Sequence, residues 1–539
     1  MSSDLNYQRT VLYQTDYFEV VSIKWLQGQI SAMHDHGSSH CMVLVEEGFF
    51  ENTVDLGFKT EKHMFEKGQV INTPIGAVHR MVCQSATGKT LHVYTPKIKK
   101  YSDEKKFSFS ENLNLKKDLN LSHETSIHEM HDLLIKIREN SISTHSPYFM
   151  NQLFSGVLPQ MLMAEELIAQ TKTTLATYEA SPLFSSIEIE VIESLCKVFG
   201  WDAEKRDGIS VPGGSAANFM ALNCARQKMF PEMKKNGIGG KKLSIFVSSE
   251  AHYSFKKACV ALGLGSDALI QVPIDDDGCM NVVELEKLIV ENKNNGGTPL
   301  LVCATSGTTV LGAFDPIDKI SNICKKHDLW LHVDGAWGGP AVFSDSLKKL
   351  VQGIHLADSV TFDAHKLFGA SLTCSFLLTQ HKGLLLEAND VSGGDYLFHP
   401  TEADCIDRGK MSWQCGRKAE VISFWTIWKS LGTKGLGAFV DRLLDIQQQT
   451  IKYIQSEPRL KLVSQPEYLN ICVRILPPHD KSEINDWSKT VRETLKNKNL
   501  AMVNYSHNQE GPFLRLILAH PYLKFEHVQQ ILKWSLDVK

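Results

Sequence analysis

The chain has 539 residues, more than one compact domain usually holds, so we expect at least two domains. Hydrophobic residues make up 43% and charged residues 22%, and the formal charge of -4 excludes a broad basic surface for nucleic acid. No apolar run has the length of a membrane helix, no signal-peptide segment begins the chain, and the twelve cysteines form no CxxC pair. We therefore expect a cytoplasmic protein with free thiols and no membrane partner.

The first region alternates apolar and polar residues from 10 to about 96, with glycines between the runs. This pattern predicts several short strands that form an all-β barrel or sandwich, and we place this domain at 1–96. Residues 97–120 are rich in lysine and asparagine and predict a linker. An apolar stripe with helical spacing then runs from Ile127 to Ile137, inside an introductory segment at 121–185.

From about residue 185 the pattern of helix followed by strand repeats, which is typical of an α/β domain. Buried parallel strands are predicted at Ser244–Ser248, Leu300–Ala304 and Leu329–Asp334, with amphipathic helices at Val283–Ile289 and Asp318–His327. We place this large domain at 186–430. A smaller α+β domain is predicted at 431–539, with strands within 460–463, 468–475 and 513–518.

Asp334 ends one of these predicted strands, and Lys366 follows the next apolar stretch. Pyridoxal phosphate needs both residue types: an amine that forms a Schiff base and a carboxylate that keeps its ring nitrogen protonated. An isolated pair of this kind is more often a strand-end acid and a surface lysine. Other features of the same domain favour the cofactor.

Small residues at Pro212–Asn218 precede the helical run Phe219–Lys228, where backbone N–H groups and the helix dipole suit a phosphate. His252 follows a strand and could stack on a flat ring, although a lone histidine is more often a capping residue. Thr305–Thr309 and Gly338–Gly339 place more small and hydroxyl residues after strands, where an open α/β sheet binds its ligand.

Residues from about 125 to 535 resemble the group II pyridoxal-phosphate-dependent decarboxylases, which include glutamate and cysteine sulfinate decarboxylases. The matching strings are Asn151-Gln152-Leu153-Phe154-Ser155-Gly156, Thr177-Tyr178-Glu179-Ala180-Ser181-Pro182, Pro212-Gly213-Gly214-Ser215, Ser249-Glu250-Ala251-His252-Tyr253-Ser254, Gly307-Thr308-Thr309, His332-Val333-Asp334-Gly335-Ala336-Trp337-Gly338-Gly339, His365-Lys366, Gln414-Cys415-Gly416-Arg417 and Phe513-Leu514-Arg515. The resemblance implies fold type I, with a large mixed, mostly parallel sheet and a small C-terminal domain, and a homodimer with a shared active site.

The resemblance also implies roles for single residues. Lys366 would carry the Schiff base, Asp334 would pair with the pyridinium and His252 would stack on the ring. The remaining cofactor contacts by this match are Ser215, Ala216, Thr308, Ala336, His365 and Gly416. Arg515 would clamp a substrate carboxylate, with Gln152, Phe154 and Ser155 beside it.

Three departures from that family bear on function. Gly335 stands where the family usually has Ala, and Asp363-Ala364 stand where it has Asn-Pro. Residues 398–409 replace a longer catalytic loop and contain no tyrosine, so His252 or His399 would have to supply the proton; otherwise a slower reaction or more transamination follows. The pattern around Phe154 resembles that of the cysteine sulfinate decarboxylases. The Phe154 ring would shorten the substrate pocket and disfavour the longer glutamate side chain, or it merely packs in the core.

The N-terminal region contains a different cluster. His34 and His36 are two residues apart and can face one metal from a strand, and His79 lies in a separate β segment. Three imidazoles with open positions suit Fe(II), although an HxH pair by itself is more often incidental.

These residues resemble the cupin core of cysteine dioxygenase. The matching strings are Tyr7-Gln8-Arg9, His34-Asp35-His36-Gly37-Ser38-Ser39-His40-Cys41, Gly76-Ala77-Val78-His79-Arg80 and Thr90-Leu91-His92-Val93-Tyr94-Thr95-Pro96, without the family's N-terminal helical part. The resemblance implies iron on the three histidines, Arg9 on the cysteine carboxylate, a Cys41–Tyr94 thioether and His92 orienting Tyr94.

The sequence thus predicts a bifunctional enzyme whose partners are small amino acids and O₂. The cupin would oxidise cysteine to cysteine sulfinate, and the large domain would decarboxylate that product to hypotaurine. Two alternatives stay open. One is a decarboxylase of cysteine sulfinate, aspartate or glutamate with a cupin that only senses a ligand, and the other is a weakly active or non-catalytic pyridoxal-phosphate-binding protein.

Overall fold

The computed structural model describes residues 7–14, 18–34, 36, 40–55, 60–73, 78–95, 120–121, 124–391, 394, 396–399, 407–478 and 486–538. Most of the predicted linker, Asp35 and residues 37–39 and 74–77 lie outside them. Contacts divide the chain into a first unit of Met1–Lys99 with Val157–Arg442 and a second of Lys100–Gly156 with Leu443–Lys539. The domain bounds predicted from the sequence remain predictions.

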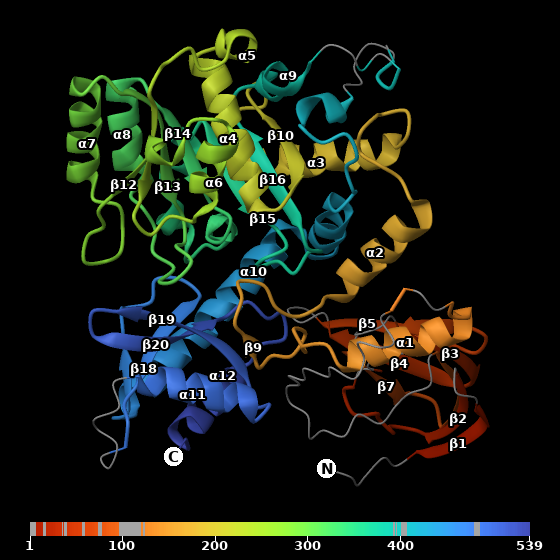
Figure 1. Cartoon of the computed structure of the whole chain (residues 1–539). Helices are drawn as coiled ribbons and strands as arrows, with labels where there is room; N and C mark the ends of the chain where they lie inside the picture. Colours follow the sequence, from red (N-terminus) through yellow and green to blue (C-terminus); the bar gives the residue numbers. More distant parts are fainter. Residues whose placement is uncertain are drawn as a thin grey trace. The chain divides into compact units, whose positions relative to one another are not determined.

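The N-terminal region, red in Figure 1, is built from antiparallel strands. The strands are β1 (Gln8–Gln14), β2 (Glu19–Leu26), β3 (His40–Glu47), β4 (Phe49–Asp55), β5 (Thr60–Glu66), β6 (Val70–Thr73), β7 (Val78–Cys83) and β8 (Thr87–Thr95). They form a sheet in the order β1-β2-β8-β3-β6 and a second in the order β5-β4-β7. The predicted β-rich region is confirmed, and its closure as a cupin barrel remains a prediction.

Alternation along β2 builds the core of this region. Val21, Ile23 and Trp25 are 0%, 4% and 2% exposed, and they share one face because alternate strand residues point the same way. Cys41 and Tyr94 pack into the same cluster from β3 and β8. The side chains of Cys41 and Tyr94 therefore lie on the inner face of the first sheet.

The first unit also contains a sheet of seven strands in the order β10-β16-β15-β14-β13-β11-β12. Its strands are β10 (Asp207–Pro212), β11 (Leu243–Ser248), β12 (Leu269–Val272), β13 (Thr298–Thr305), β14 (Trp330–Asp334), β15 (Ser359–Asp363) and β16 (Cys374–Thr379). Strands β11 to β15 pair in parallel, and β16 runs antiparallel to both of its neighbours. The mixed, mostly parallel sheet expected from the sequence is confirmed.

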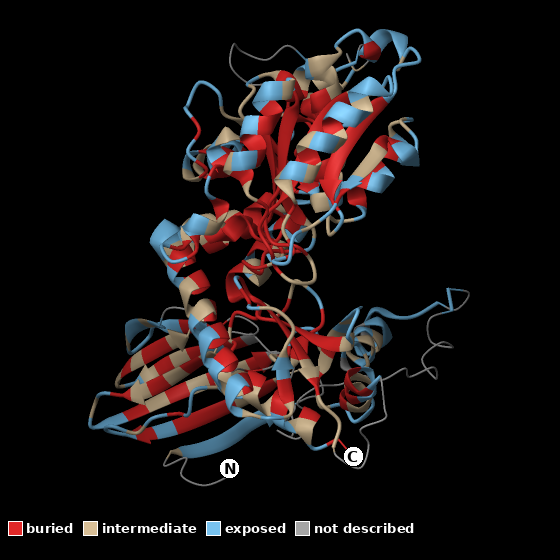
Figure 2. Cartoon of the chain, turned by 90° about the vertical axis from the view of Figure 1, so that its left-hand side faces the viewer, coloured by how far each residue is buried: buried red, intermediate tan, exposed pale blue. Residues whose placement is uncertain are grey.

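Helices cover this sheet, as Figure 1 shows. They are α3 (Pro182–Val198), α4 (Gly214–Met229), α5 (Met233–Asn236), α6 (Ser254–Ala261), α7 (Val282–Asn294), α8 (Ile317–His327) and α9 (Leu384–Asn389), while α2 (Pro159–Thr171) lies apart from the sheet. In Figure 2 the strands are buried along their length and the helices alternate buried and exposed faces. Continuous apolar strands between amphipathic helices are what a sheet covered on both faces requires. The first two predicted strands fall within β11 and β13, the third extends one residue before β14, and the predicted helices fall within α7 and α8.

The second unit is organised around a sheet in the order β17-β18-β20-β19-β9. Its strands are β9 (Phe149–Met150), β17 (Leu460–Leu462), β18 (Asn470–Ile475), β19 (Met502–Asn508) and β20 (Gly511–Ile517), and its helices are α1 (Ile127–Glu139), α11 (Trp487–Asn497) and α12 (Phe525–Leu536). The long α10 (Val421–Ser456) breaks its helical conformation at Gly432, whose φ is 66°. Over the described part of the chain, every helix is too short or too polar to cross a bilayer.

Candidate active site and candidate metal centre

Lys366 lies on the turn that follows β15, three residues after Asp363. Its Nζ is 3.1 Å from Asp363 Oδ2, and the Asp363 side chain is 2% exposed. Burial raises the pKa of Asp363, but the charges of Lys366 and His365 outweigh that effect and leave it below its usual value. The same carboxylate abuts the first turn of α4, because a Cβ added to Gly214 would lie 2.8 Å from Asp363 Oδ2. The partly buried Lys366 is thus held beside a buried carboxylate.

Asp334 ends β14 and is 6% exposed. Its Oδ2 accepts a hydrogen bond from Asn218 Nδ2 at 2.8 Å, and its Oδ1 accepts one from the Ala336 N–H at 3.1 Å. The two donors fix the positions of both carboxylate oxygens. A carboxylate fixed in this way can hold a proton on a heteroaromatic nitrogen.

Asn218 belongs to this site, although sequence reasoning gave it no role. Its Oδ1 accepts a hydrogen bond from Thr361 Oγ1 at 2.7 Å and lies 3.1 Å from His332 Nε2. Burial lowers the pKa of His332 to about 4, so the ring is neutral at pH 7. The only available signal was the position of Asn218 four residues into the helix after the glycine turn.

His252 shares an electrostatic environment with both residues. Burial lowers the pKa of His252, Asp334 opposes the shift and Lys366 adds to it. The Ser254 N–H donates to His252 Nδ1 at 3.3 Å, which fixes the ring at the start of α6. The structure therefore brings together the three residues that the sequence assigned to the cofactor ring.

Ser215 and Ala216 lie in the first turn of α4, after Gly213, whose φ of 94° favours glycine. They border a cavity of about 530 Å³, which is lined by Pro212, Ser215, Ala216, Phe219, Ser254, Lys257, Ala258, Ala261 and Trp413. The helix start offers backbone N–H donors to an anion. Together with the buried acid and the lysine, this donor set fits pyridoxal phosphate.

The other residues matched to the cofactor serve the local structure as well. The Ala313 N–H donates to Thr308 Oγ1 at 3.0 Å, and His365 Nδ1 lies 3.0 Å from the Cys374 carbonyl. Ala336 is 6% exposed and supplies the N–H that holds Asp334. Gly416 is exposed. The structure thus joins Ala336 to Asp334 directly.

The residues matched to the substrate lie in the second unit. Arg515, on β20, is 6% exposed, and its Nη2 donates to the Asn151 carbonyl at 2.8 Å. Ser155 Oγ donates to the Phe149 carbonyl at 3.0 Å, and the Phe154 and Phe149 rings lie 6.3 Å apart. Gln152 is exposed. The structure therefore brings Arg515 to the backbone just before Phe154.

Residues 400–406, within the shortened loop, lie outside the described residues. His399 precedes them and pairs with Glu179, with 3.5 Å between His399 Nδ1 and Glu179 Oε2. Both side chains are exposed, at 58% and 74%. Of the two proton donors considered from the sequence, His252 is the one placed with Lys366 and Asp334.

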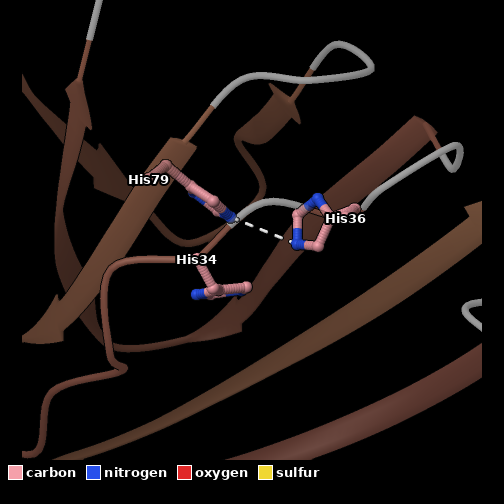
Figure 3. Close-up of side chains that lie close together, drawn as sticks. All are labelled: His34, His36 and His79. Atoms are coloured by element: carbon pink, nitrogen blue, oxygen red, sulfur yellow. Dashed lines mark hydrogen bonds between the residues drawn. The ribbon is translucent and has the colours of Figure 1, made fainter. Parts of the chain in front are cut away.

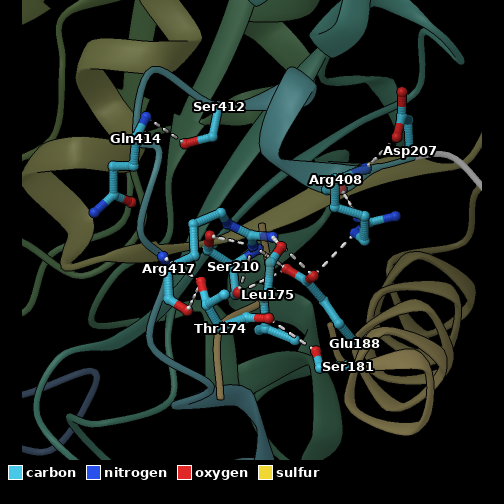
Figure 4. A network of polar contacts seen from close by, with 11 residues as sticks. Thr174, Leu175, Ser181, Glu188, Asp207, Ser210, Arg408, Ser412, Gln414 and Arg417 are labelled. Atoms are coloured by element: carbon cyan, nitrogen blue, oxygen red, sulfur yellow. Dashed lines mark hydrogen bonds and ion pairs between the residues drawn. The ribbon is translucent and has the colours of Figure 1, made fainter. Parts of the chain in front are cut away.

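A buried ionic cluster, shown in Figure 4, fixes the backbone that follows this loop. Glu188 on α3 is 0% exposed and accepts from Arg408 Nε at 3.0 Å and from Ser210 Oγ at 2.6 Å; Arg417 donates to both of its carboxylate oxygens. Burial raises the pKa of Glu188, but the two guanidinium groups outweigh it and lower the pKa to about 2. Sequence reasoning missed this cluster because its members are far apart in the chain.

His34, His36 and His79 converge in the N-terminal region (Figure 3). One ligand atom from each lies within 4.8 Å of the others, and His36 Nε2 is 3.3 Å from His79 Nε2. Burial is the main cause that lowers the pKa of His36 to about 3 and that of His79 to about 2. Neutral imidazoles whose nitrogens face one another are a suitable ligand set for a transition metal.

Hydrogen bonds to the far nitrogens orient two of these rings. His79 Nδ1 lies 2.8 Å from Asn52 Oδ1, and His34 Nδ1 lies 2.7 Å from the Ala32 carbonyl. Such partners fix the tautomer and leave Nε2 for a metal. This donor set could hold a transition-metal ion, and Fe(II) as that ion remains a prediction.

Cys41 and Tyr94 stand directly opposite each other on β3 and β8. His92 Nδ1 is 3.1 Å from Tyr94 Oη and 3.9 Å from Cys41 Sγ, and the rings of Tyr94 and His36 are 5.2 Å apart. Thr90 Oγ1 lies 2.9 Å from His92 Nε2 and accepts from Trp25 Nε1 at 2.8 Å. The predicted partners for a thioether and for its orientation are thus in place, and the bond itself remains a prediction.

Comparison with known proteins identifies the large part of the chain. The family model described as the pyridoxal-dependent decarboxylase conserved domain matches residues 113–476. Human acidic amino acid decarboxylase GADL1 is 37% identical over 418 residues, which cover 75% of this chain and 80% of the human protein. Mouse cysteine sulfinic acid decarboxylase is 37% identical over 396 residues, which cover 71% of this chain and 80% of the mouse protein.

The fold agrees with these relatives. A crystal structure of mouse CSAD superposes with a TM-score of 0.76 and 34% identity, over 80% of this chain and 92% of that one. The matching region contains Lys366, Asp334 and His252, which the structure places together. The chain belongs to the family of pyridoxal-dependent decarboxylases.

Proposed function

We propose that this chain converts cysteine to hypotaurine in two steps, a thiol oxygenation in the N-terminal region followed by decarboxylation of cysteine sulfinate. The observation that carries the proposal is the three-histidine centre beside the Cys41–Tyr94 pair, on the same chain as a pyridoxal-dependent decarboxylase. The names of the relatives, an acidic amino acid decarboxylase and a cysteine sulfinic acid decarboxylase, support an acidic substrate for the second step.

In the decarboxylase, pyridoxal phosphate supplies an electron-withdrawing ring that stabilises the carbanion left when CO₂ departs. Lys366 would hold the cofactor aldehyde, Asp334 would keep the ring nitrogen protonated and His252 would stack on the ring. Ser215 and Ala216 would bind the phosphate, and Arg515 would bind the substrate carboxylate. His252 is the candidate that returns a proton to Cα, since it shares the environment of Lys366.

In the N-terminal region, Fe(II) would offer open positions for a thiolate and O₂. His34, His36 and His79 would hold the ion, and Asn52 would keep the His79 ring in place. Tyr94 and His92 would position the substrate and a proton beside it. A homodimer in the cytoplasm is proposed with this function by family likeness.

The deciding experiment supplies the full chain with cysteine, Fe(II), pyridoxal phosphate and air, and identifies the products by mass. Hypotaurine with oxygen uptake supports the proposal. CO₂ release from cysteine sulfinate without oxygen uptake from cysteine would leave a single-activity decarboxylase with a sensor domain. No CO₂ from cysteine sulfinate, aspartate or glutamate would leave a non-catalytic cofactor-binding protein.

A further inference from the structure

A buried carboxylate lies in the same row as Tyr94 and Cys41. Cα pairing sets Glu19 opposite Tyr94, and Tyr94 opposite Cys41, across β2, β8 and β3. Glu19 is 5% exposed and shares its strand face with the core residue Val21. Since the Tyr94 ring is 5.2 Å from that of His36, this row borders the three-histidine centre.

Arg9 is the partner of this carboxylate. Its Nη2 lies 2.9 Å from Glu19 Oε2, with the two side chains 43% and 7% exposed. Tyr7, two residues earlier on the chain, packs on the core residue Trp25 with ring centroids 4.5 Å apart, which directs this side of the segment toward the core. The guanidinium expected to bind a substrate carboxylate therefore already holds a buried anion of the protein.

This pairing changes which thiols suit the centre. A carboxylate of the substrate must share Arg9 with Glu19, and two carboxylates close together repel. If Arg9 turned fully to the substrate, Glu19 would be left buried without its cation, which is strongly unfavourable. A thiol that bears an amine but no carboxylate leaves the Arg9–Glu19 pair intact.

We propose that Glu19 sets the thiol selectivity of the three-histidine centre by competing with the substrate carboxylate for Arg9, so that the centre accepts small aminothiols without a carboxylate as well as cysteine. This inference rests on the proposed oxygenase function. The reaction is R–SH + O₂ → R–SO₂H, in which sulfur is oxidised, both oxygen atoms bond to it and the thiol proton ends on the sulfinic acid. From 2-aminoethanethiol it gives the same sulfinate that decarboxylation of cysteine sulfinate gives.

The test compares Glu19→Gln with the parent chain, both full length and loaded with Fe(II). Anaerobic calorimetry measures the affinities of cysteine and 2-aminoethanethiol. The parent should bind the two thiols within about tenfold of each other, and Glu19→Gln should bind cysteine about tenfold more tightly, with little change for 2-aminoethanethiol. Glu46→Gln is the matched control, because it removes another 2.9 Å ion pair of the same region, with Lys89.

Two results would overturn the inference: weaker cysteine binding by Glu19→Gln, or an equal change for both thiols. Should Glu19→Gln fail to fold, the affinities of the parent chain for the two thiols decide. A preference for cysteine over 2-aminoethanethiol above about a hundredfold contradicts competition of Glu19 for Arg9. Oxygen uptake separates this inference from the proposed function. Thiol binding with the expected selectivity but without oxygen uptake refutes the oxygenase and leaves the role of Glu19 supported.

Discussion

The two candidate sites differ in the charge of the side chains that they bury. Around Lys366 the structure buries charges against one another, with Asp363 3.1 Å from the amine and Asp334 held by two hydrogen bonds. Around His36 and His79 it buries imidazoles whose pKa values burial has lowered far below 6.5. The first environment suits a cofactor that carries charges of its own, and the second suits a cation that needs neutral ligands.

The two sites should therefore respond differently when one of their residues is substituted. A charged site depends on its partners, so removing one charge leaves another exposed to a poor environment. Neutral histidine ligands bind a metal only when their rings are correctly oriented, so a residue that only orients a ring can strongly affect metal affinity.

Lys366→Ala should abolish the yellow absorbance of the bound cofactor and lower decarboxylation by about three orders of magnitude or more, because no other amine replaces it. Absorbance spectra and CO₂ release measure the two effects, and iron binding should not change. Lys348→Ala is a matched control, since Lys348 also pairs with an aspartate three residues earlier, Asp345 at 2.7 Å, but on the surface. A Lys366→Ala protein that stays yellow would contradict the assignment.

Glu188→Gln should lower the free energy of unfolding by about 3–5 kcal/mol, because Arg408 and Arg417 lose a buried partner. Chemical denaturation measures this. The pKa of Glu188 is lowered to about 2, so its stabilising contribution is complete above about 4.5 and disappears as pH falls from 4.5 toward 2. Glu510→Gln, which removes an exposed ion-pair partner of Lys461 and Arg474, should lower the free energy of unfolding far less.

The N-terminal region should lose stability at a higher pH than that cluster. Burial lowers the pKa of His92 to about 3 from the model-peptide value of 6.5, so the neutral ring stabilises the fold above 6.5, and this contribution disappears as pH falls toward 3. Hydrogen exchange read by mass spectrometry can follow β8 and α3 separately as the metal-free protein is acidified. Loss of protection in α3 before β8 would contradict the ordering.

Asn52→Ala should weaken Fe(II) binding by about 10- to 100-fold, since the His79 ring loses the acceptor that orients it. Equilibrium competition with a chelator measures the change. Asn72→Ala, at an exposed position of β6, should leave the affinity unaltered. Equal effects of both substitutions would show that Asn52 acts only through stability.

Asp363→Asn should produce the smallest effect, a severalfold tighter binding of pyridoxal phosphate. The carboxylate lies against the start of α4, where it disfavours a second anion, and the amide keeps a similar shape. Fluorescence titration of the cofactor-free protein measures the affinity. Binding of pyridoxal, which has no phosphate, is the control and should not tighten.

Much of the architecture was predictable because it follows from short runs of apolar residues in the sequence. The apolar runs that became β11, β13 and β14 are continuous and end in small or acidic residues, so their burial and the places of Asp334 and Lys366 followed. The comparisons confirm the predicted decarboxylase family, while the roles of single residues remain predictions. The three histidines were found because two of them share a strand-like spacing.

The rest depended on contacts that no local pattern encodes. Asn218 reaches Asp334 across 116 positions, and Arg417 reaches Glu188 across 229. The pairing of Arg9 with Glu19 spans only ten residues, yet it depends on the register of β1 against β2, which alternation alone does not fix. A strand as short as β9 has no pattern at all.

The position of β9 limits where the chain can be cut into separate fragments. Phe149 and Met150 hydrogen-bond in parallel with Met502 and Val503, and the His145 carbonyl lies 2.8 Å from His520 Nε2. A fragment cut after residue 156 would therefore take an edge strand away from the C-terminal sheet and uncover its β19 side. Proteolytic or genetic separation of the N-terminal region from the decarboxylase should cut upstream of residue 144, so that the decarboxylase fragment keeps its own edge strand.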